Sequence, residues 1–242
     1  MCGRATLTFE TLQDIDSFLN SIDSGELPSL LSGNANIDGY EYANFNAPPT
    51  SILPVCYLNE EGKRMLEPMY WWFMKWKTKD GKPNFKYSTF NARADSLLKS
   101  NLWKGVISDS TKRCIVPLSG YYEFSGSKGN KTPHYFYPTD QKYFAAAGLY
   151  SEISPNEGMK SFTIITTEPN DVQEPIHDRM PAFLRKEEFA DWLNPEHSAD
   201  YVLDMIKPYP NDAMKTHVVS KDVNSTRNRV NEPYLTEKAE LF

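Results

Sequence analysis

Short β-like runs separated by turn-forming residues are the feature that most constrains the fold of this 242-residue chain. Apolar, β-branched and aromatic residues gather in runs typical of strands, with Pro and Gly clusters between them. We expect strands at 52–58, 65–76, 114–124, 134–137, 142–153 and 161–167. Connections this short join antiparallel neighbours, because parallel neighbours need a long crossover. The sequence therefore favours an α+β fold, one domain over 1–242 with a largely antiparallel, barrel-like sheet core.

Helical spacing occurs in short stretches around these runs. Apolar residues recur every three or four positions from Phe9 to Ile22, as in an amphipathic helix. Shorter helical patterns cover 95–102, 186–193 and 199–206, and each is too short for a bundle element, so we expect peripheral helices. Residues 25–49 are rich in Ser, Asn, Gly and Pro and indicate a long irregular connection, for which an insertion is one interpretation.

The charge balance restricts how this chain could bind nucleic acid. A net charge of -6 argues against a protein that coats long stretches of phosphate, so any DNA contact must be local. Five Trp, 14 Tyr and 13 Phe would provide stacking platforms for single-stranded nucleic acid if they are exposed. A thick aromatic core explains the same composition equally well.

The cysteine and histidine positions predict no metal site and no cofactor. The three Cys and four His lack metal-ligand spacing, and we expect Cys56 and Cys114 to be buried apolar residues. The first residues contain no basic-then-apolar leader, and no apolar run is long enough to span a bilayer. We therefore expect an intracellular, cytoplasmic protein without a membrane partner.

Cys2 is the residue with the most distinctive chemistry. Removal of the initiator Met would give it a free α-amine, with a reference pKa of about 7.7 to 8.0, beside a thiol of about 8.5. Such a 1,2-aminothiol condenses with an aldehyde, first as a Schiff base and then as a five-membered thiazolidine. The alternative interpretation is a small residue at a frayed terminus.

Four separated motifs carry a family resemblance. They are MCGR at 1–4, NARAD at 91–95, GYYEF at 120–124 and IHDRMP at 176–181, with a further match at 223–228. In this order they resemble the SRAP family, the SOS-response-associated peptidases or abasic-site-processing proteins, over nearly the whole chain. The chain departs from the family at Asp95, which replaces a Glu, and at 70–76, which matches the family's Trp-Gly-Leu-x-Pro-x-Trp segment poorly.

The resemblance implies a sensor of abasic sites that acts in the DNA damage response. Cys2 would form a thiazolidine crosslink with the ring-opened abasic sugar, Asn91 would position its amine, and Glu123 and His177 would transfer protons. Opening the sugar ring does require one group that gives a proton and one that takes it. Aromatic neighbours would desolvate Glu123 and raise its pKa. A solvent-facing Glu123 and a helix-capping Asn91 remain the alternatives from the residues alone.

The expected partner is single-stranded DNA, or a junction of single and double strand, that contains an abasic site. The expected protein is a monomer that associates with the nucleoid when bound to DNA. A missing base cannot be read, so recognition must come from phosphate contacts, a sugar pocket and stacking of neighbouring bases. The residues expected at the DNA are Arg4, Asn46, Trp71, Trp72, Arg93, Thr166, Thr167 and Arg179.

Two other classes of function stay open. An N-terminal-nucleophile hydrolase would use the Cys2 thiol against an amide, including removal of Met1, and would need an oxyanion hole. A non-catalytic module would bind single strands through its aromatic and Arg side chains and leave Cys2 incidental. Covalent capture of abasic DNA separates both classes from the crosslinking reaction.

Overall fold

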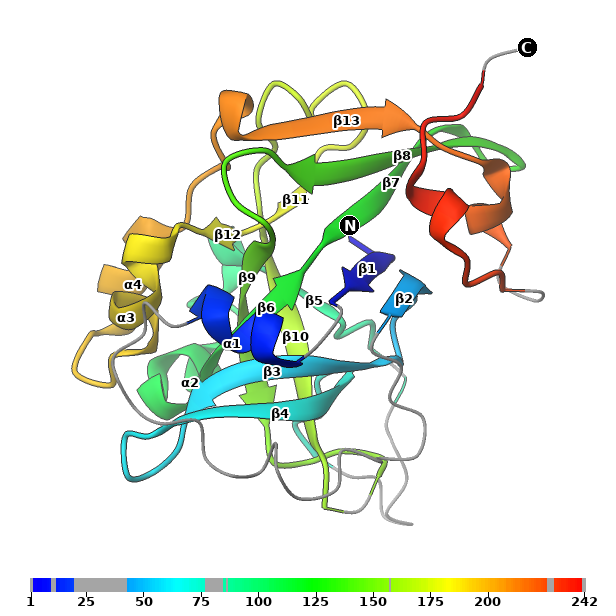
Figure 1. Ribbon diagram of the computed structural model, residues 1–242. Helices are drawn as coiled ribbons and strands as arrows, with labels where there is room; N and C mark the ends of the chain where they lie inside the picture. The colour runs from blue at the N-terminus through cyan, green and yellow to red at the C-terminus, as the bar shows by residue number, and fades with distance from the viewer. Residues whose placement is uncertain are drawn as a thin grey trace.

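Strands dominate the residues that the computed structural model describes, which are 2–9, 12–19, 43–76, 85, 87–156, 158–225 and 229–240. Within these ranges the strands form two sheets, and short helices lie at the periphery (Figure 1). Most strand pairs are antiparallel. The predicted α+β class with a barrel-like core is therefore confirmed.

The larger sheet closes into a barrel through β10. In order, its described strands are β11 (Met180–Pro181), β10 (Lys160–Thr167), β4 (Arg64–Trp71), β3 (Ile52–Leu58), β6 (Arg113–Leu118), β9 (Phe144–Ser151) and β12 (Phe183–Leu184), with β5 (Asn91–Arg93) on β10. Phe162 of β10 pairs with Trp71 of β4 on one side and Tyr150 of β9 on the other. Because β10 joins both ends of the β4-β3-β6-β9 series, the sheet has no free edge there.

The second sheet positions the amino end of the chain. Its described strands, in order, are β13 (Met214–Val218), β8 (Asn130–Pro138), β7 (Gly120–Ser127), β1 (Ala5–Thr8) and β2 (Ala43–Ala47). Only Ser119 separates β6 from β7, so the single strand expected at 114–124 is two strands in different sheets. The β7–β8 hairpin turns at residues 128 and 129, and Gly129 in the turn and Gly126 just before it have φ values of 91° and 89°, which favour glycine.

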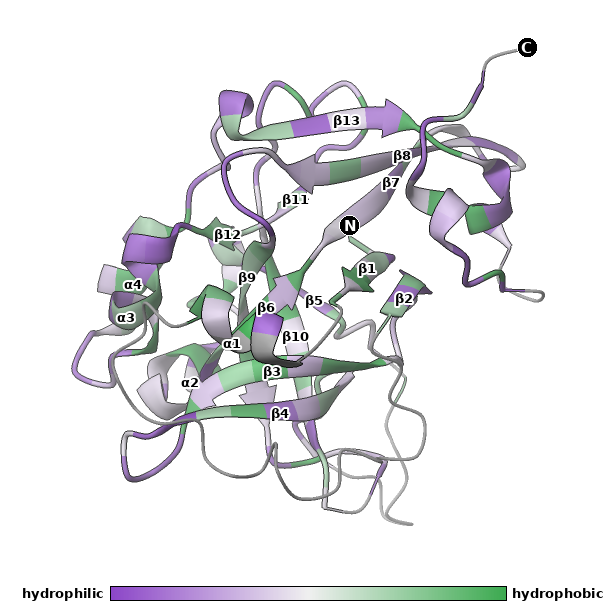
Figure 2. Cartoon of the chain, in the orientation of Figure 1, coloured by the Kyte–Doolittle hydropathy of each residue, from purple (hydrophilic) through white to green (hydrophobic). Residues whose placement is uncertain are grey.

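The barrel interior is packed with apolar side chains. Strand β9 carries three consecutive alanines, and almost all of its residues are buried. Trp71, Phe162 and Trp192 are fully buried in the same cluster. Figure 2 shows the hydrophobic residues on strands such as β1 and β3, with hydrophilic residues on the connections. Cys56 and Cys114 are buried as expected.

The helices are short, and one expected helix does not form. They are α1 (Leu12–Leu19), α2 (Lys104–Ser108), α3 (Phe189–Leu193) and α4 (Ala199–Met205), with 3-10 segments η2 (Ala94–Ser96), η3 (Ser110–Lys112), η4 (Lys186–Glu188), η5 (Asn211–Ala213), η6 (Lys221–Asn224) and η7 (Pro233–Thr236). The buried Ile15 and Leu19 confirm the first helix, and Ile22 lies outside the described residues. The helix expected at 95–102 is replaced by η2 and turns. Ser96 and Ser100 bond to nearby backbone there and compete with a regular helix.

Two strand predictions need correction. The strand expected to reach residue 76 ends at Trp71, since the chain then bends away and the Met74 N–H donates to Ser161 Oγ. The end of the expected irregular connection, Ala43–Ala47, is strand β2, paired with β1. Pairing with β1 overrides the low β propensity of its two asparagines. Residues 25–42 of that connection lie outside the described part of the chain.

Candidate functional site

Cys2 is held in place by strand β5. Asn91 Nδ2 donates a hydrogen bond to the Cys2 carbonyl at 2.8 Å, and the Cys2 side chain is fully buried. Two residues further on, the Arg4 carbonyl accepts a hydrogen bond from the Tyr122 N–H, and β1 then pairs with β7. Asn91 is therefore a strand residue and not a helix cap, and Cys2 does not lie at a frayed end.

Strand β7 places Glu123 close to Cys2. Residues 121 and 123 face one side of a strand because side chains alternate. Burial raises the pKa of the Cys2 thiol far above its ordinary value, and the Glu123 carboxylate raises it further. Burial likewise raises the pKa of Glu123, against the opposing charge of His177 and Lys131. Glu123 is only 3% exposed, so it is not a solvent-facing residue.

His177 lies on the connection between β10 and β11. Its Nδ1 accepts a hydrogen bond from the Arg179 N–H at 3.1 Å and is 3.0 Å from the Asp178 carboxylate. The Arg179 guanidinium donates to the Thr166 carbonyl and lies 3.6 Å from Asp95. These bonds fasten the connection to the end of β10.

Strand β10 explains why distant motifs meet. Its residue Ile164 pairs with Asn91, and Thr166 pairs with Arg93 on one side and Pro181 on the other. The motifs at 91–95 and 176–181 thus flank one strand end, with β7 and Cys2 held against them. The side chains of Thr166 and Thr167 are buried at this end, and Thr166 Oγ1 has no hydrogen-bond partner among the residues that the structure describes.

The arginines of the motifs divide into two groups. Arg93 and Arg179 share Asp95, at 2.9 Å and 3.6 Å. Arg4 instead donates to Asn46 Oδ1 at 2.9 Å. The Asn46 amide also donates to a backbone carbonyl at 3.0 Å and is fully buried, so it supports Arg4 and offers no surface to DNA.

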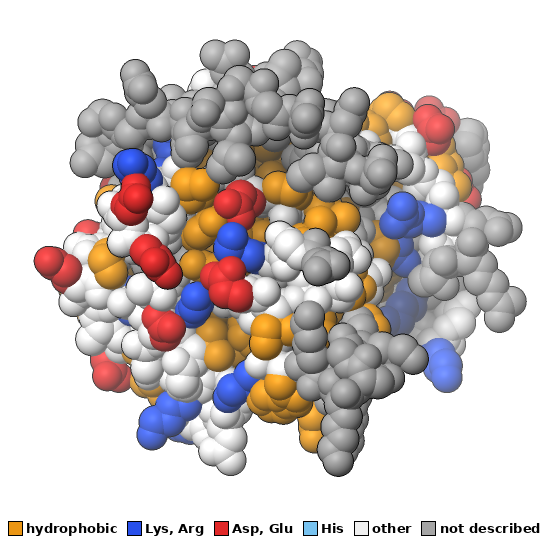
Figure 3. All heavy atoms as spheres, turned by 90° about the horizontal axis from the view of Figure 1, so that it is seen from below, with side chains coloured by type: hydrophobic (Ala, Val, Ile, Leu, Met, Phe, Trp, Pro, Cys, Tyr) orange, Lys and Arg blue, Asp and Glu red, His pale blue; other side chains and the backbone are white. Residues whose placement is uncertain are grey.

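A cationic pocket opens next to the Cys2 peptide. It has a volume of about 350 Å³, and its described lining is Gly3, Arg4, Phe124, Gly129, Lys131 and Asn224. Two of these side chains are cations and none is a carboxylate. Burial lowers the pKa of Arg4, and the charge of Arg229 lowers it further. An anionic group such as a phosphate would relieve this repulsion. Elsewhere, acidic and basic side chains are interspersed, as on the face in Figure 3.

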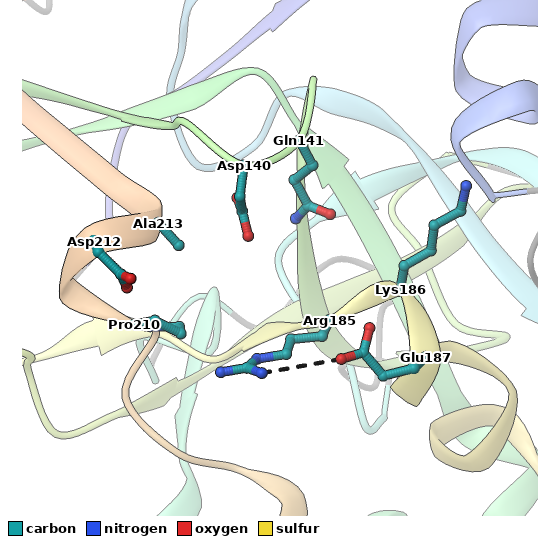
Figure 4. A pocket seen from close by; sticks show the side chains of 8 residues that line it. All are labelled: Asp140, Gln141, Arg185, Lys186, Glu187, Pro210, Asp212 and Ala213. Carbon is teal, nitrogen blue, oxygen red and sulfur yellow. Dashed lines mark ion pairs between the residues drawn. The ribbon is translucent and has the colours of Figure 1, made fainter.

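A larger pocket of about 440 Å³ shares no residue with the Cys2 site (Figure 4). Its walls carry charges of both signs, and several are already paired. Asp140 accepts a hydrogen bond from the Tyr209 hydroxyl, and Arg185 lies 4.0 Å from Glu187. It contains no Cys, Ser or His among its described lining residues. No group of three or more His, Cys, Asp or Glu suited to a metal occurs in the described ranges.

The two tryptophans expected at the DNA differ in exposure. Trp71 is fully buried, donates from Nε1 to the Phe90 carbonyl at 2.9 Å and stacks on Phe162. The structure therefore does not support base stacking by Trp71. Trp72 is half-buried, packed against Phe85 and Phe90.

Two exposed aromatics, Phe85 and Tyr87, were not singled out from the sequence, whereas Trp76 belongs to the 70–76 segment that matches the family poorly. Trp76, Phe85 and Tyr87 are 46%, 50% and 50% exposed. Their polar sequence neighbours, rich in Lys, are the signal that could have separated them from core aromatics.

The geometry defines a β-barrel protein in which a cysteine at position 2 is buried beside a carboxyl group, and an imidazole influences that carboxyl group. The model of the family "SOS response associated peptidase (SRAP)" matches residues 1–226. The chain therefore belongs to the SRAP family.

Its relatives cover nearly its full length. It is 36% identical over 243 residues to "Abasic site processing protein YoqW" of Bacillus subtilis, covering 98% of this chain and 99% of the relative. It is 28% identical to "Abasic site processing protein HMCES" of Xenopus tropicalis, covering 96% of this chain and 77% of the relative. A crystal structure of a protein from Bacteroides thetaiotaomicron shares the fold, with a TM-score of 0.74 at 23% identity over 99% of this chain and 100% of that one. None of the helices in the described ranges has the length and apolar content to cross a membrane.

Proposed function

We propose that this chain captures abasic sites in single-stranded DNA through a covalent thiazolidine between Cys2 and the ring-opened sugar. The observation that carries the proposal is the position of Cys2, which is fixed to Asn91 at 2.8 Å and lies beside the buried Glu123, whose carboxyl is in turn influenced by the charge of His177. The names of the relatives, abasic site processing proteins, favour the same substrate. The proposal includes a role in the DNA damage response. The protein would act as an intracellular monomer that associates with the nucleoid when it is bound to DNA.

The reaction begins with opening of the sugar. The C1′ hydroxyl loses a proton while O4′ gains one, which produces the aldehyde, and Glu123 and His177 serve as the acid and base. A carboxyl group with a raised pKa suits this task because it holds and releases a proton nearer to neutral pH. Sequence Met1-Cys2 places the Cys2 nitrogen in a peptide bond, so the proposal requires removal of Met1.

The amine then attacks before the thiol. Burial keeps the Cys2 thiol protonated, whereas a free α-amine is partly neutral at cell pH. The amine adds to C1′, water leaves, and a C=N bond forms. The sulfur next adds to that carbon while the thiol proton passes to the nitrogen. The sum is aldehyde plus aminothiol giving thiazolidine plus one water, and no cofactor or metal is required.

The DNA would be held on either side of Cys2. The cationic pocket with Arg4 and Lys131 suits one phosphate, and the pair of guanidiniums at Asp95 suits another. The half-buried Trp72 could support a neighbouring base, worth about 1 to 3 kcal/mol. A single strand is the expected substrate because no duplex must be opened to expose the sugar.

Covalent capture tests the proposal directly. Single-stranded oligonucleotides, one with a uracil converted to an abasic site and one intact, are incubated with the protein and separated on a denaturing gel. Mass spectrometry of the same protein checks for loss of Met1. We expect a shifted band with the abasic strand alone, and none with Cys2→Ala, whose affinity for intact single strand stays within about twofold.

The control is Cys56→Ala, the same substitution at a buried cysteine of β3 away from the motifs, which should crosslink like the wild type. A processed protein that binds abasic DNA without a shifted band would contradict the proposal and favour a non-catalytic module. Cleavage of amide substrates in its place would favour the hydrolase.

A further inference from the structure

Gln173 connects the two halves of the candidate site. It lies in the turns between β10 and β11, and its side chain is fully buried. Its Oε1 accepts a hydrogen bond from the Tyr121 hydroxyl at 2.9 Å, and its Nε2 donates to the Arg179 carbonyl at 3.1 Å. One amide thereby ties strand β7, which carries Glu123, to the connection that carries His177.

The backbone of Gln173 holds the same connection from its other end. Its carbonyl accepts hydrogen bonds from the N–H groups of Ile176 and His177, at 2.9 Å and 3.0 Å. Its N–H donates to the carbonyl and side-chain oxygens of Asn170, at 3.1 Å and 3.0 Å. The Asn170 amide in turn donates to the Tyr209 carbonyl at 2.7 Å. His177 is thus attached to Gln173 both directly and through Arg179.

The attachment also sets which nitrogen of His177 carries the proton. The Arg179 N–H donates to Nδ1, so the neutral ring has its proton on Nε2. The carbonyl of this same Arg179 is the group that the Gln173 amide holds. The Asp178 carboxylate, 3.0 Å from Nδ1, would instead accept a hydrogen bond from a ring protonated on Nδ1, either the charged ring or the other neutral tautomer, in which the bond from the Arg179 N–H is lost.

Only an amide satisfies both ends of this bridge. The Tyr121 hydroxyl is a donor here, and its pKa is raised by burial and by the nearby charges of Cys2 and Glu123. Glu at position 173 would lack the donor and bury a charge, and Met would leave a buried hydroxyl and a buried carbonyl without partners.

We propose that Gln173 is a positioning residue of the crosslinking reaction, which holds the His177 ring toward Glu123 in the tautomer that carries its proton on Nε2. The inference rests on the proposed function for its catalytic consequence, and on the hydrogen bonds alone for its effect on His177. Gln173 acts through Arg179 and His177 and does not touch the sugar.

The test compares Gln173→Met with Gln141→Met. Gln141 also shares a hydrogen bond with a tyrosine hydroxyl, that of Tyr209 at 3.1 Å, but in the pocket away from Cys2. We expect Gln173→Met to slow crosslinking of abasic single strand about tenfold or more, with affinity for intact single strand unchanged, because a small misplacement of a catalytic group suffices. Gln141→Met should crosslink at the wild-type rate. A wild-type rate in folded Gln173→Met, or equal losses in both variants, would overturn the proposal.

A second pair of variants distinguishes a loss of His177 positioning from a loss of protein stability. Tyr121→Phe leaves the Gln173 oxygen without its donor, whereas Tyr121→Phe with Gln173→Met replaces both partners by apolar groups. We expect the double variant to crosslink no more slowly than Gln173→Met alone, since Tyr121 acts through Gln173. Fully additive losses would show that the two side chains act independently and would contradict the bridge.

Nitrogen NMR of labelled histidine supplies a readout that does not depend on crosslinking. At mildly alkaline pH the wild type should show His177 protonated on Nε2, and Gln173→Met should show a mixture of both tautomers, while Gln141→Met matches the wild type. Identical His177 spectra in wild type and Gln173→Met would overturn the proposal. If the wild type forms no crosslink, the proposed function fails, and the His177 spectra still decide the role of Gln173.

Discussion

Glu123 combines a functional position with an energetic cost. It is almost fully buried beside the buried Cys2 thiol, and burial raises its pKa. Between the ordinary carboxyl pKa near 4.5 and the raised folded value, the folded state binds more protons than the unfolded state. Stability therefore falls as pH rises through that window, and the penalty is complete above it.

Glu123→Gln should slow crosslinking and raise the thermal stability of the protein. The amide cannot transfer the proton, so we expect crosslinking to slow about 100-fold or more. The amide also removes the buried charge, so the variant should melt at a higher temperature than the wild type at neutral pH. This difference should shrink as pH falls toward 4.5, where both states of the wild type become protonated.

Thermal melts over a pH series and single-turnover gels measure the two effects of Glu123→Gln. The exposed Glu61→Gln is the matched control for the melts, because Glu61 lies on the surface away from the site. Equal melting temperatures of wild type and Glu123→Gln at every pH would show that the buried charge is not destabilising. A crosslinking rate within about twofold of the wild type would remove Glu123 from the mechanism.

The strand pair β9–β10 closes the barrel on which the site stands. A Cβ at Gly148 of β9 would lie 2.8 Å from the Thr163 carbonyl of β10 and 2.9 Å from Cys114 Sγ. These atoms belong to strands β10 and β6, which cannot shift without disturbing the hydrogen bonds between the strands of the sheet. The end of the same β10 carries Thr166 beside the Arg93 and Pro181 backbones.

Gly148→Ala should therefore destabilise the protein, by about 1 to 3 kcal/mol for an overpacked core. The control is Gly105→Ala in α2, where a Cβ meets no atom within 4 Å and Ala is the better helix former by about 0.5 to 1 kcal/mol. Urea denaturation measures both variants. Opposite shifts of the midpoint are expected, and a Gly148→Ala midpoint equal to that of the wild type would show that the β9–β10 contact can relax.

The whole molecule carries a net charge of -6, so only a few local cations can attract DNA. The candidate contacts are Arg4, Arg93, Lys131 and Arg179, and two of these share Asp95. On the face in Figure 3, charges of both signs lie side by side. Affinity for single-stranded DNA should consequently depend only modestly on salt.

We expect the logarithm of the association constant for intact single strand to fall with the logarithm of salt concentration with a slope of about -3 or shallower, since each neutralised phosphate contributes about -0.7. Fluorescence anisotropy at several salt concentrations measures this slope. Lys131→Gln should reduce its magnitude by about 0.7, and Lys63→Gln, at an exposed ion pair elsewhere, should leave it unchanged. A slope near -6 would reveal a phosphate-binding surface beyond these residues.

Local sequence patterns predicted much of the fold. The runs at 52–58, 134–137 and 161–167 lie within strands β3, β8 and β10, because β-branched and aromatic residues mark strands wherever they pack. Strand β2 and the split between β6 and β7 were not predicted. Asn-rich β2 forms by pairing with β1, and only the three-dimensional course of the chain shows that β6 and β7 enter different sheets.

The sequence by itself determined which chemical groups are present: a cysteine at position 2 that would become an aminothiol on loss of Met1, a glutamate among aromatics, and a histidine in a proline-bounded turn. The tertiary structure decided which of these residues meet. The pairing of β10 with β5, and of β7 with β1, brings Asn91 and Glu123 to Cys2, and the connection from β10 to β11 brings His177 close enough to influence Glu123. It also buried Trp71 and placed Gln173 between the two halves of the site, since burial and contact depend on pairings between residues far apart in the chain.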